Sequence, residues 1–193
     1  MIYQPAEDSY LLQKYVARFA KNKKVLDIGT GSGIQAGTAI KNGAKYVLAV
    51  DINNEAIELL KERIEKKGIK RLKAQISDLF SNINKKEKFD LIVINPPYLP
   101  RDKIEDKESA LETTGGEHGY ELIERFFLGA KEYLATPGKI LVVFSSLTNT
   151  RKVKKIAENN GFKLKILGKE KFPFETLYVG FCSSGVSPTT NQK

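Results

Sequence analysis

Residues 25–33 read Val-Leu-Asp-Ile-Gly-Thr-Gly-Ser-Gly, and this stretch decides the fold. It begins with residues that suit a buried strand, continues with three glycines that alternate with other residues, and leads into a helical pattern from Ile34. Glycines at the start of a helix let the backbone approach a ligand closely and present N–H groups to it. The stretch therefore predicts a strand, a ligand-binding loop and a helix, as in an open α/β sheet.

The details of this loop distinguish between two kinds of ligand. Its glycines, Gly29, Gly31 and Gly33, follow the spacing G-x-G-x-G, which differs from the dinucleotide pattern G-x-G-x-x-G. Asp27 stands two residues before the first glycine, where a carboxylate would repel a pyrophosphate. The same carboxylate suits a cation such as the α-amino group of a methionine moiety. S-adenosylmethionine has that group and no phosphate, so we expect it as the cofactor.

Hydrophobic periodicity predicts alternating helices and strands along the rest of the chain. We expect helices over 7–19, 34–41, 54–67, 120–134 and 150–160, and strands over 25–28, 46–50, 72–76, 89–94, 139–144, 162–167 and 176–181. Such alternation predicts a parallel sheet with right-handed crossovers. Residues 168–175 leave no room for a helix between the last two strands, so one of these strands is antiparallel. A seven-stranded, mostly parallel sheet with one antiparallel strand is the Rossmann-like arrangement of class I methyltransferases.

Two more carboxylates stand at the ends of the next two expected strands. Asp51 comes about twenty residues after the first glycine, where a carboxylate accepts hydrogen bonds from ribose hydroxyls. Asp78 can accept from an adenine amino group, with Leu79 against the ring. Each acid alone has an ordinary alternative as a helix cap or a surface charge. Three acids in order at the carboxyl ends of consecutive strands, together with the glycine loop, predict one cofactor site.

Residues 95–98 read Asn-Pro-Pro-Tyr and follow the expected strand over 89–94 directly. Proline restricts its own φ and the conformation of the residue before it, so the backbone carbonyls point in fixed directions. The amide, the carbonyls and the aromatic ring form a rigid acceptor cradle for a planar N–H₂ group. The tetrapeptide is typical of methyltransferases that modify amide or exocyclic amino nitrogens. Its ordinary alternative is a tight turn, which Asn-Pro often initiates.

Composition limits the class of protein. The chain has 193 residues, and we expect one methyltransferase domain with an N-terminal helix over 1–182, followed by a disordered polar tail over 183–193. It shows neither a signal peptide nor an apolar stretch of the roughly 18–20 residues that a membrane span needs, so we expect a cytoplasmic protein. One cysteine, Cys182, and one histidine, His118, argue against a metal site, and we expect none.

The net charge of +9 has two interpretations. Basic residues cluster at 21–24, 61–73 and 151–155. They predict either a solvated surface with Glu–Lys pairs, as in proteins from hot environments, or attraction to RNA or an acidic partner. Interspersed acidic residues favour the solvated surface.

These motifs together resemble a known family, the HemK-like release-factor glutamine N5-methyltransferases, in their archaeal and eukaryotic branch. The opening residues 3–9, Tyr-Gln-Pro-Ala-Glu-Asp-Ser, are similar to the start of that branch. The resemblance continues through residues 27–33, 51–53, 78–79, 95–98, 115–116, 125–127 and 175–177. It covers nearly all of residues 1–182.

The resemblance implies methyl transfer from S-adenosylmethionine to the glutamine side-chain nitrogen in the Gly-Gly-Gln motif of a class I translation termination factor. The cofactor residues that it implies are Ser9, Asp27, Gly29, Gly31, Gly33, Asp51, Ile52, Asp78, Leu79 and Asn95. The substrate residues that it implies are Asn95, Pro96, Pro97 and Tyr98. The eukaryotic members need a small zinc-binding activator beside an edge strand, here 71–76. Lys73 and Gln75 interrupt that strand, so dependence on an activator stays open.

We assign catalytic roles to three residues of this cradle. The Asn95 side-chain oxygen and the Pro96 carbonyl accept the two hydrogens of the substrate amide, and these bonds strengthen as positive charge develops on nitrogen. Tyr98 stacks on the amide plane and excludes water. No general base is needed, because the proton can leave to solvent after the transfer.

Alternatives remain at this point. The same cradle suits amino groups of adenine or guanine in DNA or RNA, although the chain has little room for a base-recognition domain. Protein lysine is another possible substrate, and an RNA-binding module with the same fold is the non-enzymatic alternative. The glycine-punctuated residues 112–120 form either a lid over the substrate or a long connection.

Overall fold

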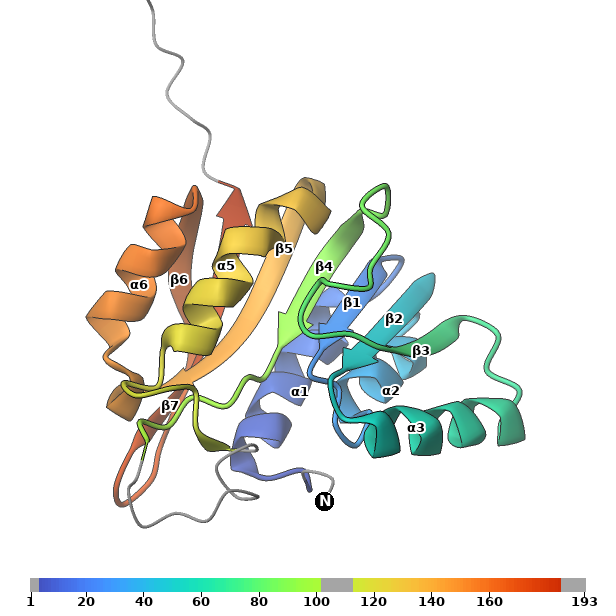
Figure 1. Ribbon diagram of the computed structural model, residues 1–193, viewed down its shortest axis with the longest axis horizontal. Coiled ribbons are helices and arrows are strands. Elements are labelled where there is room, and N and C mark those ends of the chain that lie inside the picture. Colours follow the sequence, from blue (N-terminus) through green and yellow to red (C-terminus); the bar gives the residue numbers. More distant parts are fainter. Residues whose placement is uncertain (1–3, 102–112, 185–193) are drawn as a thin grey trace, which may run out of the picture.

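The computed structural model describes residues 4–101 and 113–184 (Figure 1). The described chain forms a seven-stranded sheet with the strand order β3-β2-β1-β4-β5-β7-β6. The elements are α1 (Glu7–Phe19), β1 (Lys24–Ile28), α2 (Ile34–Lys41), β2 (Tyr46–Asp51), α3 (Asn54–Lys66), β3 (Leu72–Ile76), β4 (Phe89–Ile94), α5 (Glu121–Tyr133), β5 (Leu134–Ser145), the 3₁₀ turn η1 (Ser146–Thr148), α6 (Thr150–Asn159), β6 (Phe162–Lys171) and β7 (Thr176–Ser184).

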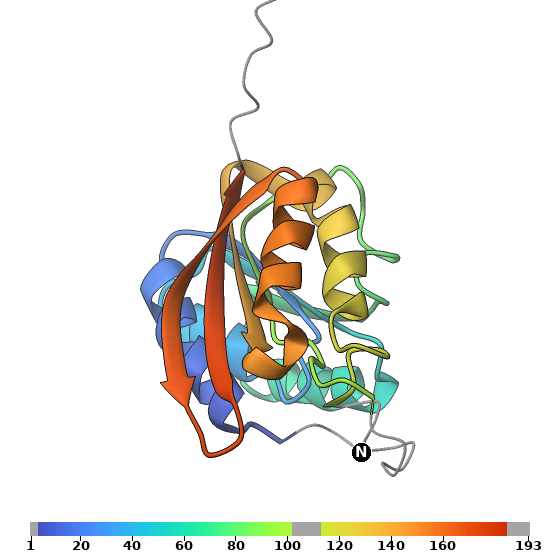
Figure 2. The ribbon, with the colours of Figure 1, turned by 90° about the vertical axis from the view of Figure 1, so that its left-hand side faces the viewer.

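Helices cover both faces of the sheet, which Figure 2 shows from the side. α5 and α6 pack on one face and α1, α2 and α3 on the other. The central strands are apolar on both sides for this reason. In β4, Ile92 and Ile94 point into the first core, whereas Leu91 and Val93 point into the second. Parallel strands buried on both faces read as continuous apolar runs, and the sequence 89–94 follows that rule.

The predicted fold class is confirmed. Strands β1 to β5 pair in parallel, and β7 runs antiparallel to both of its neighbours, β5 and β6. The antiparallel strand is β7, which lies one place inside the edge, because β6 crosses over it and forms the edge itself. This arrangement places the carboxyl ends of β1 to β4 along one rim of the sheet, where ligands of open α/β sheets bind.

Some predicted boundaries are wrong. The helix expected over 54–67 is α3, which ends at Lys66, and its cap is Asn53, whose side chain accepts from the N–H groups of Glu55 and Ala56. The strand expected over 139–144 is β5, which already begins at Leu134, and the β4–β5 register shifts between Leu134 and Lys139. β4 pairs with Leu134 before this irregular segment and with Lys139 after it, whereas β7 pairs with β5 from Lys139 onward.

The final hairpin is longer than its sequence pattern predicts. β6 continues to Lys171 because β7 pairs with it beyond the apolar residues, across a register shift after Ile166. β7 extends to Ser184, so two residues of the expected tail, Ser183 and Ser184, belong to the sheet. Residues 185–193 lie outside the described part of the chain.

The glycine-rich connection before α5 is fixed to the segment that follows the Asn-Pro-Pro-Tyr sequence. Leu99 donates its N–H to the Thr113 carbonyl at 2.9 Å, and Gly115 donates to the Leu99 carbonyl at 3.0 Å. Arg101 donates in turn to Gly116 at 3.1 Å. These bonds favour the interpretation as a connection for residues 113–120; Glu112 lies outside the described residues. Within the described ranges, no helix is long and apolar enough to cross a membrane.

Two glycine substitutions test how closely this connection packs. In Gly119→Ala, the added Cβ would lie 2.4 Å from the Tyr98 carbonyl oxygen, at a φ of +82°. We expect a loss of about 1–3 kcal/mol in the free energy of unfolding. The control is Gly37→Ala in α2, which is exposed and has no atom within 4 Å of the added Cβ. It should gain about 0.5–1 kcal/mol, because alanine favours a helix interior. Urea denaturation of both variants measures this, and a change of the same sign in both would contradict the packing argument.

Candidate active site

One cavity of about 660 Å³ lies at the carboxyl ends of β1 to β4. Its volume is in the usual range of small-molecule sites, roughly 300–1,000 Å³. The first turn of α1, the loop after β1, the ends of β2 and β3, the Asn-Pro-Pro-Tyr segment after β4 and the first turns of α5 line it. The cavity thus brings together segments from residue 8 to residue 125.

The register between β1 and β4 sets the centre of the site. Ile28 pairs with Ile94, so the glycine loop and the Asn-Pro-Pro-Tyr segment begin side by side. A Cβ added at Gly29 would lie 4.0 Å from the Asn95 carbonyl oxygen. Gly33 begins α2 at a φ of +80°, and a Cβ there would lie 2.8 Å from a Leu60 methyl group. Gly29 and Gly31 line the cavity, whereas Gly33, the N-cap residue of α2, does not.

Asp27 lies underneath the glycine loop and is only 1% exposed. One carboxylate oxygen accepts from the Thr30 hydroxyl at 2.6 Å and from the Ala36 N–H at 3.0 Å. Burial raises the pKa of this carboxyl from 3.8 to about 6, while the two hydrogen bonds oppose the rise and Asp51 adds to it. Asp27 is absent from the lining of the cavity. It holds the loop in shape, and its expected contact with a cationic ligand stays a prediction.

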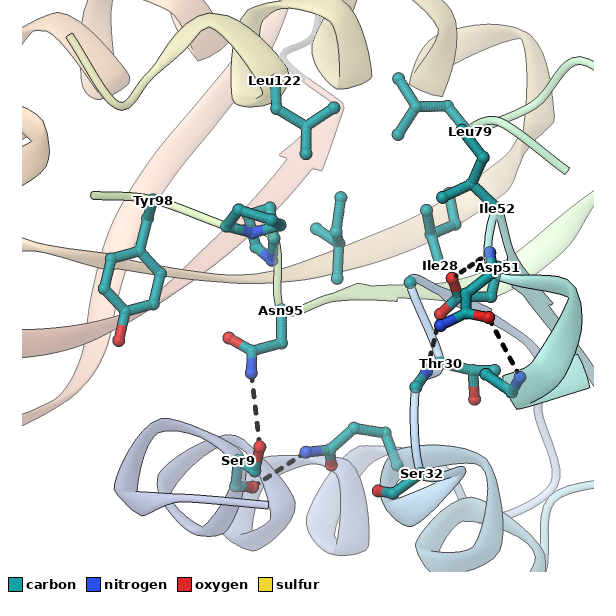
Figure 3. Close-up of a pocket in the computed structure, with 18 of the residues that line it drawn as sticks. Ser9, Ile28, Thr30, Ser32, Asp51, Ile52, Leu79, Asn95, Tyr98 and Leu122 are labelled. Carbon is teal, nitrogen blue, oxygen red and sulfur yellow. Dashed lines mark hydrogen bonds between the residues drawn. The ribbon is translucent and has the colours of Figure 1, made fainter. Parts of the chain in front are cut away.

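Asp51 faces the cavity from the end of β2 (Figure 3). One of its oxygens accepts from the Gly31 N–H at 2.8 Å, and the other accepts from the Asn53 N–H at 2.9 Å. These two bonds fix the plane of the carboxylate. Asn53 also caps α3 with its side chain, so one residue binds both the Asp51 carboxylate and the start of the helix.

The end of the cavity that lies beside β2 and β3 is apolar, and an ion pair stands at its rim. Ile52, which is 71% exposed, and Leu79 flank it. Leu79 has a φ of +50°, which is uncommon outside glycine and concentrates at functional sites. Asp78 accepts from the Arg125 guanidinium at 2.7 Å. An apolar slot with a carboxylate at its edge suits a flat heterocycle that carries an amino group.

The opposite end contains Asn95 and the first turn of α1. The Asn95 amide nitrogen donates to the Asp8 carboxylate at 3.0 Å and lies 3.4 Å from the Ser9 hydroxyl oxygen. Its oxygen is buried and has no hydrogen-bond partner among the described residues. Pro96, Pro97 and Tyr98 also line the cavity. The Tyr98 ring points away from the Asn95 amide in Figure 3 and packs against the core that contains α1, so stacking on a substrate remains a prediction.

A second amide in the cavity repeats this pattern. Gln35 donates from its side-chain nitrogen to the Ser9 carbonyl at 2.8 Å, and its own oxygen is buried without a partner within the described ranges. Buried polar atoms are almost always hydrogen-bonded, so two unpartnered oxygens in one cavity indicate ligand groups that donate.

Sequence reasoning missed several residues of the site. Asp8, Gln35, Leu122 and Arg125 line the cavity but lie outside the glycine loop, the strand-end acids and the Asn-Pro-Pro-Tyr sequence. Asp8 stands in the opening motif and Arg125 in a later segment of the resemblance, so both could have been considered. The contacts themselves join residues 87 and 47 positions apart, which no local pattern reveals.

The single histidine and the single cysteine of the chain both lie outside the cavity lining. His118 is exposed, and its ring nitrogen lies 2.8 Å from the Glu121 carboxylate. Cys182 is buried between β5 and β6, and burial raises the pKa of its thiol to about 12.

Comparison with known proteins identifies the family. Residues 8–166 match the family model described as "Methyltransferase small domain". The chain belongs to this methyltransferase family. The predicted cofactor, S-adenosylmethionine, and the predicted class of enzyme are confirmed with it.

Individual relatives resemble this methyltransferase closely. A relative from Methanocaldococcus jannaschii, described as a candidate protein N5-glutamine methyltransferase, is 39% identical over 180 residues, which cover 92% of this chain and 89% of that one. A release factor glutamine methyltransferase from Clostridium acetobutylicum is 33% identical over 82% of this chain, but the match spans only 60% of that longer protein.

A solved structure shows the same fold. It is the E. cuniculi Mtq2-Trm112 complex, whose description names methylation of the eRF1 translation termination factor. It aligns with a TM-score of 0.74 and 25% identity over 95% of this chain and 99% of that one. The expected resemblance to the archaeal and eukaryotic branch is confirmed by these relatives.

The buried Asp27 predicts a pH dependence of the cofactor-free methyltransferase. The folded chain binds more protons than the unfolded chain between the ordinary pKa of 3.8 and the raised pKa of about 6. The contribution of Asp27 to stability is therefore greatest below pH 4 and is lost as the pH rises through 6. At about 1.4 kcal/mol per pKa unit, the loss is about 3 kcal/mol.

Asp27→Asn keeps an oxygen acceptor for Thr30 and Ala36 and removes the titration. We expect the free energy of unfolding of this variant to exceed that of the wild type at pH 8, with the difference shrinking towards pH 4.5. Urea denaturation at both pH values, without cofactor, measures it. A difference that is equal at both pH values would show that the Asp27 carboxyl is not buried as described.

Proposed function

We propose that this methyltransferase transfers a methyl group from S-adenosylmethionine to the side-chain amide nitrogen of the glutamine in the Gly-Gly-Gln motif of a class I translation termination factor. The observation that carries this proposal is the Asn95 amide oxygen, buried in the cavity with no partner among the described residues. An acceptor held in this way fits an N–H₂ group. The names of the relatives support glutamine as the residue that carries it.

The cavity fits the cofactor in three parts. Asp51, fixed by two backbone N–H groups, would accept from the ribose hydroxyls. Ile52 and Leu79 would enclose the adenine, with Asp78 accepting from its amino group. The unpartnered Gln35 oxygen would accept from the α-amino group, and the Asp27 charge beneath the loop would favour that cation.

The residues around Asn95 would carry the chemistry by positioning. An amide nitrogen is a weak nucleophile because its lone pair is delocalised. S-adenosylmethionine supplies a methyl group on a sulfonium centre when it is bound. The Asn95 oxygen and the Pro96 carbonyl would orient the substrate nitrogen towards it and stabilise the positive charge that develops there. The two prolines hold both acceptors rigidly, and no base is required before the transfer.

A small activator protein is part of this proposal. The E. cuniculi neighbour is described as a complex with Trm112. In this chain β3 is the edge strand on the same side of the molecule as the adenine end of the cavity, and it exposes Ile76 and Lys73. We propose that a small zinc-binding protein pairs with this edge and covers Ile76.

Methyl transfer from labelled S-adenosylmethionine tests the function. One reaction contains an archaeal-type termination factor and another contains total RNA or DNA, each with and without a small zinc-binding activator. We expect label on the factor, and none on a factor whose Gly-Gly-Gln glutamine is replaced. Label in nucleic acid alone would assign the cradle to a base amino group and the positive charge to substrate binding. Equal rates with and without activator would remove the partner from the proposal.

Asn95→Ala should abolish methyl transfer and leave cofactor binding nearly intact, because the side chain is expected to act on the substrate nitrogen. The measurements are the turnover rate and the dissociation constant of S-adenosylmethionine by calorimetry. Asn54→Ala is the matched control, since this asparagine is exposed at the start of α3 and does not line the cavity. If the Asn95 variant kept more than about a tenth of the activity, a barrier change below roughly 1.4 kcal/mol, Asn95 would not be the catalytic acceptor.

A further inference from the structure

The orientation of the Asn95 amide depends on a residue from the other end of the sequence. Asp8 lies in the first turn of α1 and is 6% exposed. One of its carboxylate oxygens accepts from the Asn95 side-chain nitrogen at 3.0 Å, and the other accepts from the Ser9 N–H at 2.5 Å. The dashed line below Asn95 in Figure 3 runs to Ser9, whose hydroxyl oxygen lies 3.4 Å from the same nitrogen.

We propose that Asp8 is a positioning residue that determines which end of the Asn95 amide faces the substrate. A carboxylate has only acceptors, so it can pair with the N–H₂ end of the amide and not with its oxygen. The oxygen is thereby left in the cavity. This inference rests on the proposed function, in which that oxygen accepts from the substrate nitrogen.

Shape alone would not fix this choice. The two ends of an amide are nearly equal in size, so a rotated side chain would fit the same space. A rotated Asn95 would bring its oxygen against the Asp8 carboxylate and present N–H groups to a substrate that also donates. Both contacts are unfavourable, and the first of them, with the Asp8 carboxylate, is present before a substrate binds. The carboxylate also polarises the amide to which it is bonded, which strengthens the oxygen as an acceptor.

The turn that carries Asp8 is itself held in place. Ser9 is 2% exposed, and its carbonyl accepts from the Gln35 side chain at 2.8 Å. α1 is therefore attached to α2 at the position where it reaches Asn95. An ordinary alternative is that Asp8 only stabilises the start of α1, where acidic residues interact well with the helix dipole. Glu7 offers the same dipole effect from an exposed position outside the cavity lining, which provides a control.

Asp8→Asn tests the proposal with a residue of the same shape. The introduced amide can donate, so it allows Asn95 to rotate and present its nitrogen. We expect kcat to fall about tenfold or more, while the dissociation constant of S-adenosylmethionine and the melting temperature stay close to those of the wild type. Glu7→Gln should leave kcat unchanged. Equal losses in both variants would reduce Asp8 to a helix-stabilising role.

A paired exchange provides a test that a structural role would not pass. Asn95→Asp alone places two carboxyl groups together, and one of them must hold a proton. Asp8→Asn combined with Asn95→Asp lets the new amide donate to the new carboxylate, whose second oxygen faces the substrate. We expect the double variant to exceed both single variants in kcat. If it is no better than either, Asp8 does not act through the orientation of residue 95.

A spectroscopic measurement separates this inference from the substrate assignment. The N–H₂ signal of Asn95, assigned by its loss in Asn95→Ala, should shift and exchange faster with solvent in Asp8→Asn but not in Glu7→Gln. This readout needs no substrate. If the wild type fails to label the factor, the proposed function fails while the spectra still decide the role of Asp8. An unchanged Asn95 signal in Asp8→Asn would overturn the inference.

Discussion

The pairing of β1 with β4 is the constraint on which the rest of the site depends. Both strands are buried on both faces, and their register places Ile28 opposite Ile94. The loop that follows β1 and the segment that follows β4 therefore start at the same height and lie against each other. A slip of one residue would reverse the faces of every side chain in the strand, which the two apolar cores do not permit. The sheet thus fixes the distance between the cofactor loop and Asn95 before either binds anything.

Asp27 and Asp51 differ in burial and in hydrogen bonding, and these differences separate their structural roles. Asp27 is fully enclosed, and its bonds to Thr30 and Ala36 shape the loop while burial raises its pKa. Asp51 is partly exposed, and its two backbone bonds leave it directed at the cavity. These two carboxylates stand at equivalent strand ends, yet of the two only Asp51 lines the cavity. Equivalent positions in a repeating sheet therefore do not imply equivalent roles.

Much of this could be predicted from the sequence, because the informative features are local. Short segments of sequence identify the strand-loop-helix unit around Gly29, the strand-end acids and residues 95–98. The alternation of helices and strands predicts the class of sheet. The contacts of Asp8 with Asn95 and of Arg125 with Asp78 could not be predicted from pattern, because they join distant turns through the fold. The Asn53 cap and the long β6–β7 hairpin were missed for a related reason: neighbouring turns and strand pairing, rather than periodicity, decide where those elements begin and end.

The two amides of the cavity give the site a consistent polarity. Asn95 and Gln35 both commit their nitrogens to the first turn of α1, to a carboxylate in one case and a backbone carbonyl in the other. Both oxygens are left buried and unpartnered within the described chain. Amides alone are ambiguous, since either end can face a ligand, but acceptors on α1 remove the ambiguity. A cavity prepared in this way favours ligands that donate hydrogen bonds: an ammonium group at Gln35 and an N–H₂ group at Asn95. In the proposed function, selectivity for nitrogen would therefore begin with the acceptors of α1, which lie behind the two amides and orient them.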